Sequence, residues 1–395
     1  MKEPFRVTVA ERRARLARRH HLAPEARAGS VAEVAGSLVG LHSTDPATVF
    51  LSAALRLREP SLTAVEGALY DDRTVLRMLG MRRTVFVVPL DLAPVVQEST
   101  VGPIAAAQRK LLIELLATTG VATDVQAWLG EVEAATVAAL DRRGEATAAE
   151  LAKDEPRLRT QVVLARGKPY EGSQSISTRI LLTLAAEGRL VRGRPLGSWI
   201  SSQYRWAPIE RWLPAGLDSW TAEAAQAELV RRYLHAYGPA PVADVKWWTG
   251  WSAGDVRRAL QAADVVAVDL DGAAGVALTG DLEPAQRVEP WAALLPALDP
   301  SVMGWQVRSW FLGPHAPALF DRSGNAGPTV WWDGRVVGGW AQRPSGQVVV
   351  RLLEDPGAQG REAIERAARD VERQIGDRRV TPRFRTPLEK ELSAR

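Results

Sequence analysis

Residues 227–280 carry the most restrictive pattern in this sequence, because three short helices and a hairpin can be read there in order. Apolar side chains recur at helical spacing until Gly238-Pro239 ends the first helix. A second helix is expected over 241–248, and Ser252 can cap a third. The segments VVAVDL and VALTG then alternate like paired strands. This order predicts a winged helix-turn-helix unit, which commonly places its third helix against DNA with the hairpin alongside.

A looser copy of the same order occupies residues 126–208. The helical segments WLGEVEAATVAALDRRG, TAAELAKDEPRL and STRILLTLAAEGRL follow one another, and Thr147 can cap the second. LVRGRPLGSWISSQYRWAP then predicts two strands around a glycine turn. The beginning of the chain gives a weaker third version, with helices expected at 8–20, 30–41, 46–57 and from about 61, before the strand TVFVVP.

After residue 285 the pattern changes from helical to β-rich. Proline, glycine and tryptophan become more frequent, and Asp333-Gly334 predicts a tight hairpin turn. A final helix near 359–375 and a basic tail are expected to follow. The fold class is therefore α+β, with tandem winged helix-turn-helix domains and a β-rich C-terminal domain. Four domains are expected. They are an N-terminal winged-helix-like domain over 1–125, a basic winged-helix domain over 126–215, a third winged-helix domain over 216–285, and a β-rich domain with a terminal helix over 286–395.

Composition narrows the class of protein. With 395 residues, the chain is long enough for several domains. The absence of cysteine excludes disulfides and thiolate catalysis and removes the usual ligands of structural zinc. No apolar run reaches the roughly 18–20 residues that a bilayer requires, and the first residues lack the pattern of a secretory signal. We expect a cytoplasmic, nucleoid-associated protein with no membrane contact, acting as a monomer.

The distribution of charge indicates a polyanionic partner. The formal net charge is only +4, yet the segment from 157 to 205 contains nine basic residues and only two acidic ones. Nearly all of the cations are arginine, which suits fork-like contacts with phosphate. Genomic base content is an alternative source of the arginine excess, but it explains the local clustering less well. The clustering therefore favours nucleic acid as the partner.

Residues 38–57, LVGLHSTDPATVFLSAALRL, contain the densest cluster of small polar side chains in the chain. Asp45 can accept a hydrogen bond from the first turn of a helix, and Pro46 suits the first helical position. A helix start therefore accounts for Asp45 and Pro46 but leaves His42, Ser43 and Thr44 unexplained. A packed or solvated loop histidine is the alternative to a functional His42.

Several segments, in the same order along the chain, resemble a known family. LVGLHSTDP is similar to the L-V-G-L-Q-x-Q-x-P segment of the AlkZ/YcaQ-type winged-helix DNA glycosylases, a group of winged helix DNA-binding domain-containing proteins. RTVLRMLGMRRTVFVV, RRYLHAYGPAPVADVKWWTG, LLPALDPSVMGWQVRSW and DGRVVGGW resemble further segments of that family. The resemblance implies tandem winged-helix domains and a β-rich domain around a C-shaped, concave DNA-binding surface. It also implies excision of alkylated purines.

The resemblance places the catalytic motif on two residues of this chain. Better-known members carry Gln-apolar-Gln or Gln-apolar-Asp, whose side chains position or activate the water that attacks the anomeric carbon. The matching positions here are His42 and Thr44, so a neutral imidazole and a hydroxyl would replace the amide pair. Ser43 and Asp45 beside them are further catalytic candidates. The altered motif suggests an altered substrate, namely purines with bulky N7-alkyl groups.

Arginines are the expected contacts with DNA phosphates. The candidate DNA-binding residues are Arg77, Arg82, Arg83, Lys168, Arg179, Arg192, Arg194, Arg205 and Arg308. For the first three, a solvated helix end paired with Asp71 or Asp72 is the alternative. An internal pair with Asp299 is the alternative for Arg308. The tryptophan pairs 247–248 and 331–332 are expected to give one buried and one partly exposed ring each.

Taken together, these features predict a monofunctional DNA glycosylase acting on double-stranded DNA that carries alkylated purine adducts. The adducts of a DNA-alkylating natural product fit this description, in repair or in self-resistance. Two alternatives are a DNA-binding regulator or lesion shield without catalysis and a protein that sequesters a drug. No metal, nucleotide or other cofactor is expected, because the histidines lack ligand spacing and no phosphate-binding glycine motif is present.

Overall fold

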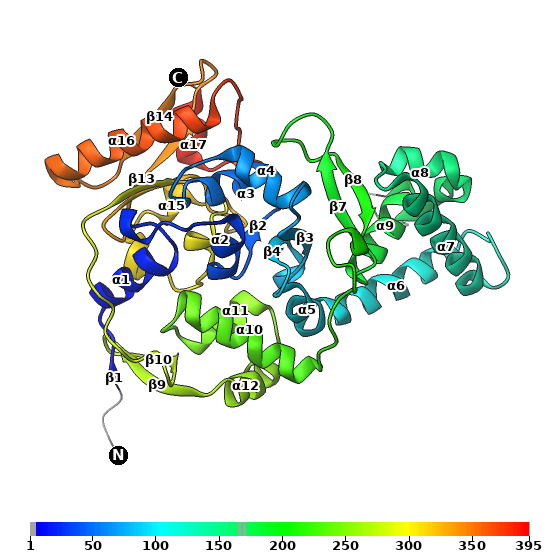
Figure 1. Cartoon of the computed structure of the whole chain (residues 1–395), viewed down its shortest axis with the longest axis horizontal. Helices are drawn as coiled ribbons and strands as arrows, with labels where there is room; N and C mark the ends of the chain where they lie inside the picture. The colour runs from blue at the N-terminus through cyan, green and yellow to red at the C-terminus, as the bar shows by residue number, and fades with distance from the viewer. Residues whose placement is uncertain (1–4, 165–166, 169–170, 395) are drawn as a thin grey trace.

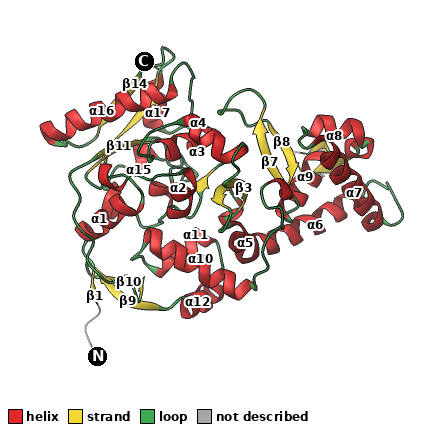
Figure 2. Ribbon diagram, viewed as in Figure 1, coloured by secondary structure: helices red, strands yellow, loops and turns green. Residues whose placement is uncertain are grey.

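The computed structural model describes residues 5–164, 167–168 and 171–394, and it contains helices and short antiparallel sheets in alternation (Figures 1 and 2). The first part of the chain supplies β1 Phe5–Arg6, α1 Val9–Arg19, α2 Val31–Ser37, β2 Leu41–His42, α3 Pro46–Ala54, α4 Leu62–Tyr70, β3 Val75–Leu79 and β4 Val85–Pro89. Each of these four helices begins after a serine, threonine or aspartate whose side chain accepts an N–H of the first turn. Strands β2, β4 and β3 form one antiparallel sheet in that order.

A continuous helical path then leads away from this sheet. It consists of α5 Ala93–Val96, a π-helical turn over Gln97–Val101 and α6 Gly102–Ala117. In Figure 1 α6 runs from the centre of the molecule toward α7 and α8. The sequence patterns did not predict this segment.

The second unit has its own hydrophobic core. It comprises α7 Val125–Arg143, α8 Ala148–Asp154, β5 Gln161–Leu164, β6 Gly172–Ser175, α9 Ser177–Ala186, β7 Leu190–Pro195 and β8 Tyr204–Pro208. Thr147 caps α8 as expected, and Glu150 completes a capping box. The three expected helices and the β7–β8 hairpin are present, and β5–β6 is an additional hairpin.

The third unit follows the expected order of elements. It contains α10 Ala222–Tyr237, α11 Val242–Thr249, α12 Ala253–Ala262, β9 Val265–Leu270 and β10 Ala273–Leu278. Ser252 caps α12, which confirms the expected helix start. Strand β1 joins this sheet parallel to β9, so Phe5 and Arg6 pair with the third unit rather than with the first.

The C-terminal part is an antiparallel sheet covered by helices. It contains β11 Ala292–Leu295, α13 Pro300–Met303, α14 Ser309–Leu312, α15 Ala316–Leu319, β12 Thr329–Trp332, β13 Arg335–Gln342, β14 Val348–Leu352, α16 Gly357–Ile375 and α17 Pro387–Ser393. The strands pair in chain order, and α16 packs on the sheet through Ile364, Val371 and Ile375. Asp333 and Gly334 both have positive φ at the predicted hairpin turn.

A buried ion pair joins the N-terminal and C-terminal parts. Arg56 and Asp299 form a salt bridge of 2.7 Å with both side chains fully buried. Ser52 donates to the same carboxylate, and Ser301 accepts from Arg56 and contacts His20. The alternative pair of Asp299 with Arg308 was therefore wrong, because Arg56, just after the end of α3, is the partner of Asp299.

The tryptophan pairs behave as the sequence predicts. Trp248 and Trp331 are buried, while Trp247 and Trp332 are partly exposed. Within the described residues, none of the helices is long and apolar enough to cross a membrane. The same part of the chain contains no group of three or more side chains that could ligate a metal ion.

Candidate active site and DNA interface

The HSTDP segment lies where β2 ends and α3 begins. Asp45 caps α3 by accepting from the N–H of Ala47 through Oδ1, at 3.1 Å. Its Oδ2 accepts from the backbone N–H of Arg383 at 2.9 Å. Burial raises the pKa of Asp45, and these two N–H groups oppose that shift. Both carboxylate oxygens are thus engaged by backbone donors, which explains the position of Asp45 structurally and speaks against the expected catalytic role.

Ser43 is held from behind by a buried arginine. Its Oγ accepts from Nε of Arg77 at 2.7 Å, and Arg77 also donates to the hydroxyl of Tyr70 at 3.0 Å. The Arg77 guanidinium lies 4.5 Å from the ring centroid of Tyr204, and the residue is only 2% exposed. Arg77 therefore supports the motif from inside the protein. The expected contact of Arg77 with phosphate is wrong, because it lies in a sheet strand and not on a solvated surface.

His42 is almost enclosed. It is 5% exposed, its ring packs edge-on against Phe86 at 5.4 Å, and Nδ1 is buried without a hydrogen-bond partner. Burial, followed by the nearby charge of Arg82, lowers the pKa of His42 to about 4. The imidazole is therefore neutral at physiological pH and has a nitrogen free to accept a proton.

Thr44 lines a groove on the other side of the motif. The groove has a volume of about 460 Å³ and is lined by Ser43, Thr44, Pro46, Val85, Thr178, Leu182, Arg192, Ser202, Gln203, Tyr204, Trp206 and Arg383. The lining contains two arginines, several hydroxyl and amide side chains and two aromatic rings. His42 is not part of it, so in the free protein the imidazole and the Thr44 hydroxyl are not brought together in one groove.

The turn between β3 and β4 carries two arginines in a strained conformation. Arg82 and Arg83 have φ of 54° and 59°, a region that residues other than glycine rarely occupy. Arg82 lies 4.0 Å from the ring centroid of Trp247, and Arg308 approaches the same ring at 5.0 Å. Burial is the main cause that lowers the pKa of each of these two guanidinium groups to about 10.

This cationic pair lacks acidic partners. Across the residues that the structure describes, neither Arg82 nor Arg308 forms a salt bridge, and each has a buried nitrogen without a hydrogen-bond partner. The expected alternatives for them were pairs with Asp71, Asp72 or Asp299. Instead, Asp71 pairs with Arg194. The charge of Asp244 acts on Arg308 without a direct salt bridge, and two guanidinium groups on one indole ring that lack a direct acidic partner suit an anion such as phosphate.

The candidate arginines of the second unit differ in their surroundings. Arg194 forms salt bridges with Glu66 and Asp71, so its charge is already neutralised, which speaks against the expected phosphate contact. Arg192 lies over Tyr204 and Trp206 at 5.6 Å from each ring centroid and faces the groove. The remaining candidates do not line it: Lys168 and Arg83 are exposed, and Arg179 and Arg205 are half-buried.

Arg383 is a residue of this site that the sequence patterns missed. It lies between α16 and α17, yet it contacts the motif through its backbone and through a 3.3 Å hydrogen bond to the carbonyl of Thr44. The basic tail had been noted only as a charge feature. Nothing local in the sequence shows that the tail returns to a segment 338 positions earlier.

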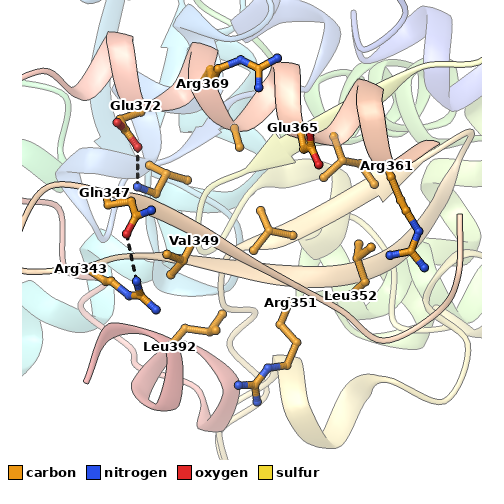
Figure 3. A pocket seen from close by; sticks show the side chains of 14 residues that line it. Arg343, Gln347, Val349, Arg351, Leu352, Arg361, Glu365, Arg369, Glu372 and Leu392 are labelled. Carbon is orange, nitrogen blue, oxygen red and sulfur yellow. Dashed lines mark hydrogen bonds between the residues drawn. The ribbon is translucent and has the colours of Figure 1, made fainter. Parts of the chain in front are cut away.

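A larger groove at the C-terminal sheet does not share these properties. It measures about 760 Å³ and lies along the edge strand β14 between α16 and α17 (Figure 3). Its arginines alternate with Glu365 and Glu372, and Arg351 and Arg361 pair with Glu391 and Asp355. Because acids balance its cations, we place the candidate site at the motif.

Comparison with known proteins agrees with the sequence resemblance. The family model described as "DNA glycosylase AlkZ-like" matches residues 35–374. No curated protein sequence matches the chain. Among solved structures, the DNA glycosylase AlkZ of Streptomyces sahachiroi superposes with a TM-score of 0.72 at 22% identity, covering 95% of this chain and 98% of that one. At this identity the likeness establishes the shared fold. The extent of the family match shows that the chain belongs to the AlkZ-like family of DNA glycosylases.

Proposed function

We propose that this protein is a monofunctional DNA glycosylase that hydrolyses the N-glycosidic bond of bulky N7-alkylated purines in double-stranded DNA. The water is positioned by His42 and Thr44, two residues apart on the same connection from β2 to α3. The observation that carries this proposal is the neutral, unpartnered imidazole of His42 at the position of the family's catalytic motif.

The chemistry demands little from the protein. Alkylation at N7 gives the purine a positive charge, so the base leaves without being protonated. The enzyme then needs a positioned water and stabilisation of an oxocarbenium-like sugar. A neutral histidine can accept the proton of that water, and a threonine hydroxyl can hold its oxygen. A neutral ring also avoids repulsion with the cationic base, which a protonated histidine would add.

The free structure sets one condition on this mechanism. Because His42 is 5% exposed and packs against Phe86, its ring has to turn away from that contact when the lesion binds. Thr44 already lines an open groove. Because the motif lies beside an open groove and not in a closed pocket, a bulky adduct can approach it without complete extrusion of the base.

The proposed substrates are guanine adducts left by a DNA-alkylating natural product, and the proposed setting is repair or self-resistance. The protein would act as a monomer at the nucleoid in the cytoplasm. The enclosure of His42 favours a second candidate function, a protein that binds or shields lesions without catalysis. Such a protein would hold adducted DNA and leave the glycosidic bond intact.

The test uses duplex DNA with one defined N7-alkylguanine, incubated with the purified protein and then heated in base to cut abasic sites. Strand cleavage is expected with the wild type and with His235→Ala, a histidine outside the site. It is expected to fall strongly with His42→Ala and less with Thr44→Ala. Binding without cleavage, across several adduct sizes, would overturn catalysis and support the shielding function.

A further inference from the structure

The groove beside Thr44 is lined by two cations, while the neighbouring carboxylate of Asp45 is already engaged by backbone N–H groups. Its two arginines, Arg192 and Arg383, accompany Ser43, Thr178 and other neutral hydroxyl and amide side chains, and no acidic residue lines it. Within the described part of the chain, no carboxylate forms a salt bridge with either arginine. Two guanidinium groups among neutral polar side chains, with no carboxylate in the lining, form a composition that suits an anion.

A third guanidinium adds to this positive field. Arg77 lies behind the groove wall, is 2% exposed, and has one buried NH₂ group without a partner. Burial lowers the pKa of Arg192, and the nearby charges of Arg77 and Arg383 lower it further. Both Arg77 and Arg192 approach the ring of Tyr204, whose hydroxyl is also buried without a partner. Gathering like charges in this way is unfavourable unless a ligand compensates for it.

The tail that delivers Arg383 is firmly anchored on both sides. The N–H of Val380 donates to Gln342 at 2.8 Å, and Thr386 is 1% exposed. Beyond it, α17 buries Leu388 and Leu392. The backbone of Arg383 is therefore fixed against Asp45, while its side chain is exposed at the groove. An exposed cation on a fixed backbone can bind a ligand at a low cost in conformational entropy.

We propose that this groove binds a phosphate of the DNA strand that carries the lesion, with Arg383 and Arg192 as its charged contacts. This inference rests on the proposed function and specifies how the substrate is held. Phosphate contacts set the register of a protein on the duplex, and a phosphate held next to Thr44 would place the adjoining sugar at the motif. The C-terminal tail is thereby part of the substrate-binding surface.

The experiment measures binding of the full-length protein to an undamaged duplex over a range of salt concentrations. Each lost phosphate contact reduces the slope of log affinity against log salt by roughly 0.9. Arg383→Gln and Arg192→Gln are each expected to reduce the slope by about that amount. Arg378→Gln removes the same charge from an exposed position of the same tail and serves as the control. Arg383→Lys is expected to keep the wild-type slope, since lysine also binds phosphate as a point charge.

Two results would overturn the inference. One is that Arg383→Gln and Arg192→Gln give the same slope of log affinity against log salt as Arg378→Gln, while all three variants keep the wild-type melting temperature. The other is a loss of slope in Arg383→Lys as large as in Arg383→Gln. Undamaged DNA carries no alkylated base for the protein to release, so this measurement reports binding alone and stays valid if the proposed catalysis fails.

Discussion

Nε of Arg77 donates a hydrogen bond to Oγ of Ser43 at 2.7 Å. This contact joins the motif to strand β3, which pairs with β4. The same guanidinium reaches Tyr70, so one buried side chain connects β3, α4 and the motif. A planar, forked donor can make both contacts at once, whereas a lysine ammonium cannot do so in the same geometry.

Arg77→Lys is therefore expected to destabilise the protein by about 1–3 kcal/mol, the usual effect of leaving buried polar groups unpaired. Denaturant unfolding measures this loss, with Arg83→Lys at an exposed position as the control. The salt dependence of DNA binding should not change, because Arg77 does not reach the surface. A reduced slope with unchanged stability would restore the phosphate role for Arg77.

Arg56→Met should be among the most destabilising substitutions in the chain. It removes one partner of a fully buried ion pair and leaves the Asp299 carboxylate without its main counter-charge. Breaking such pairs typically costs about 3–5 kcal/mol. Calorimetry is expected to show a large drop in melting temperature, and the double variant Arg56→Met with Asp299→Leu should recover part of it. A drop no larger than that of a surface arginine variant would contradict the role of this pair.

Acid should destabilise the fold through its enclosed histidines. Burial lowers the pKa of His42 to about 4 and that of His20 to about 3, whereas the unfolded chain has values near 6.5. The unfolded state therefore binds more protons below pH 6.5, and stability is expected to fall as the pH drops from 6.5 toward 4. His42→Asn should weaken this fall, as measured by melting temperature against pH.

The same neutral imidazole predicts a flat pH profile for glycosylase activity between about pH 5.5 and 8. The assay is base release across that range at protein concentrations too low to saturate binding, because this rate reports the pKa of His42 in the free protein. A decline with a midpoint near the unperturbed value of about 6.5 would show that His42 titrates as an ordinary exposed histidine. That outcome would contradict the enclosed, neutral state.

The arginines on Trp247 should contribute to DNA affinity. Arg82→Gln and Arg308→Gln are each expected to weaken binding and to reduce the salt slope by roughly 0.9, because each loses one unpaired guanidinium. Fluorescence anisotropy with an undamaged duplex measures both effects, with Arg322→Gln as an exposed control. Equal slopes for all three variants would show that the Trp247 pair does not bind the DNA backbone.

Local sequence signals predicted much of the fold. The caps at Asp45, Thr147 and Ser252 and the turn at Asp333-Gly334 were predicted because each depends on neighbouring residues only. The family resemblance identified the motif, since its segments follow one another in the expected order.

Contacts between distant segments could not be predicted in this way. A pair of Asp299 with Arg308, which is nearby in sequence, was the alternative considered, although the partner of Asp299 is Arg56, just after α3. Arg383 was missed because its place depends on the return of the tail to Asp45. Arg77 was expected to contact phosphate because of its charge and its place in a segment that resembles the family, whereas strand β3 buries it against Ser43 and Tyr70.

Mass spectrometry of the base released from a duplex with one defined N7-alkylguanine tests the central claim most directly. The account predicts that the wild type releases the intact alkylguanine and that His42→Ala releases it more slowly by roughly 10²-fold or more, with DNA binding retained. Equal release by the two proteins, or no release by the wild type with any adduct tested, would contradict the account.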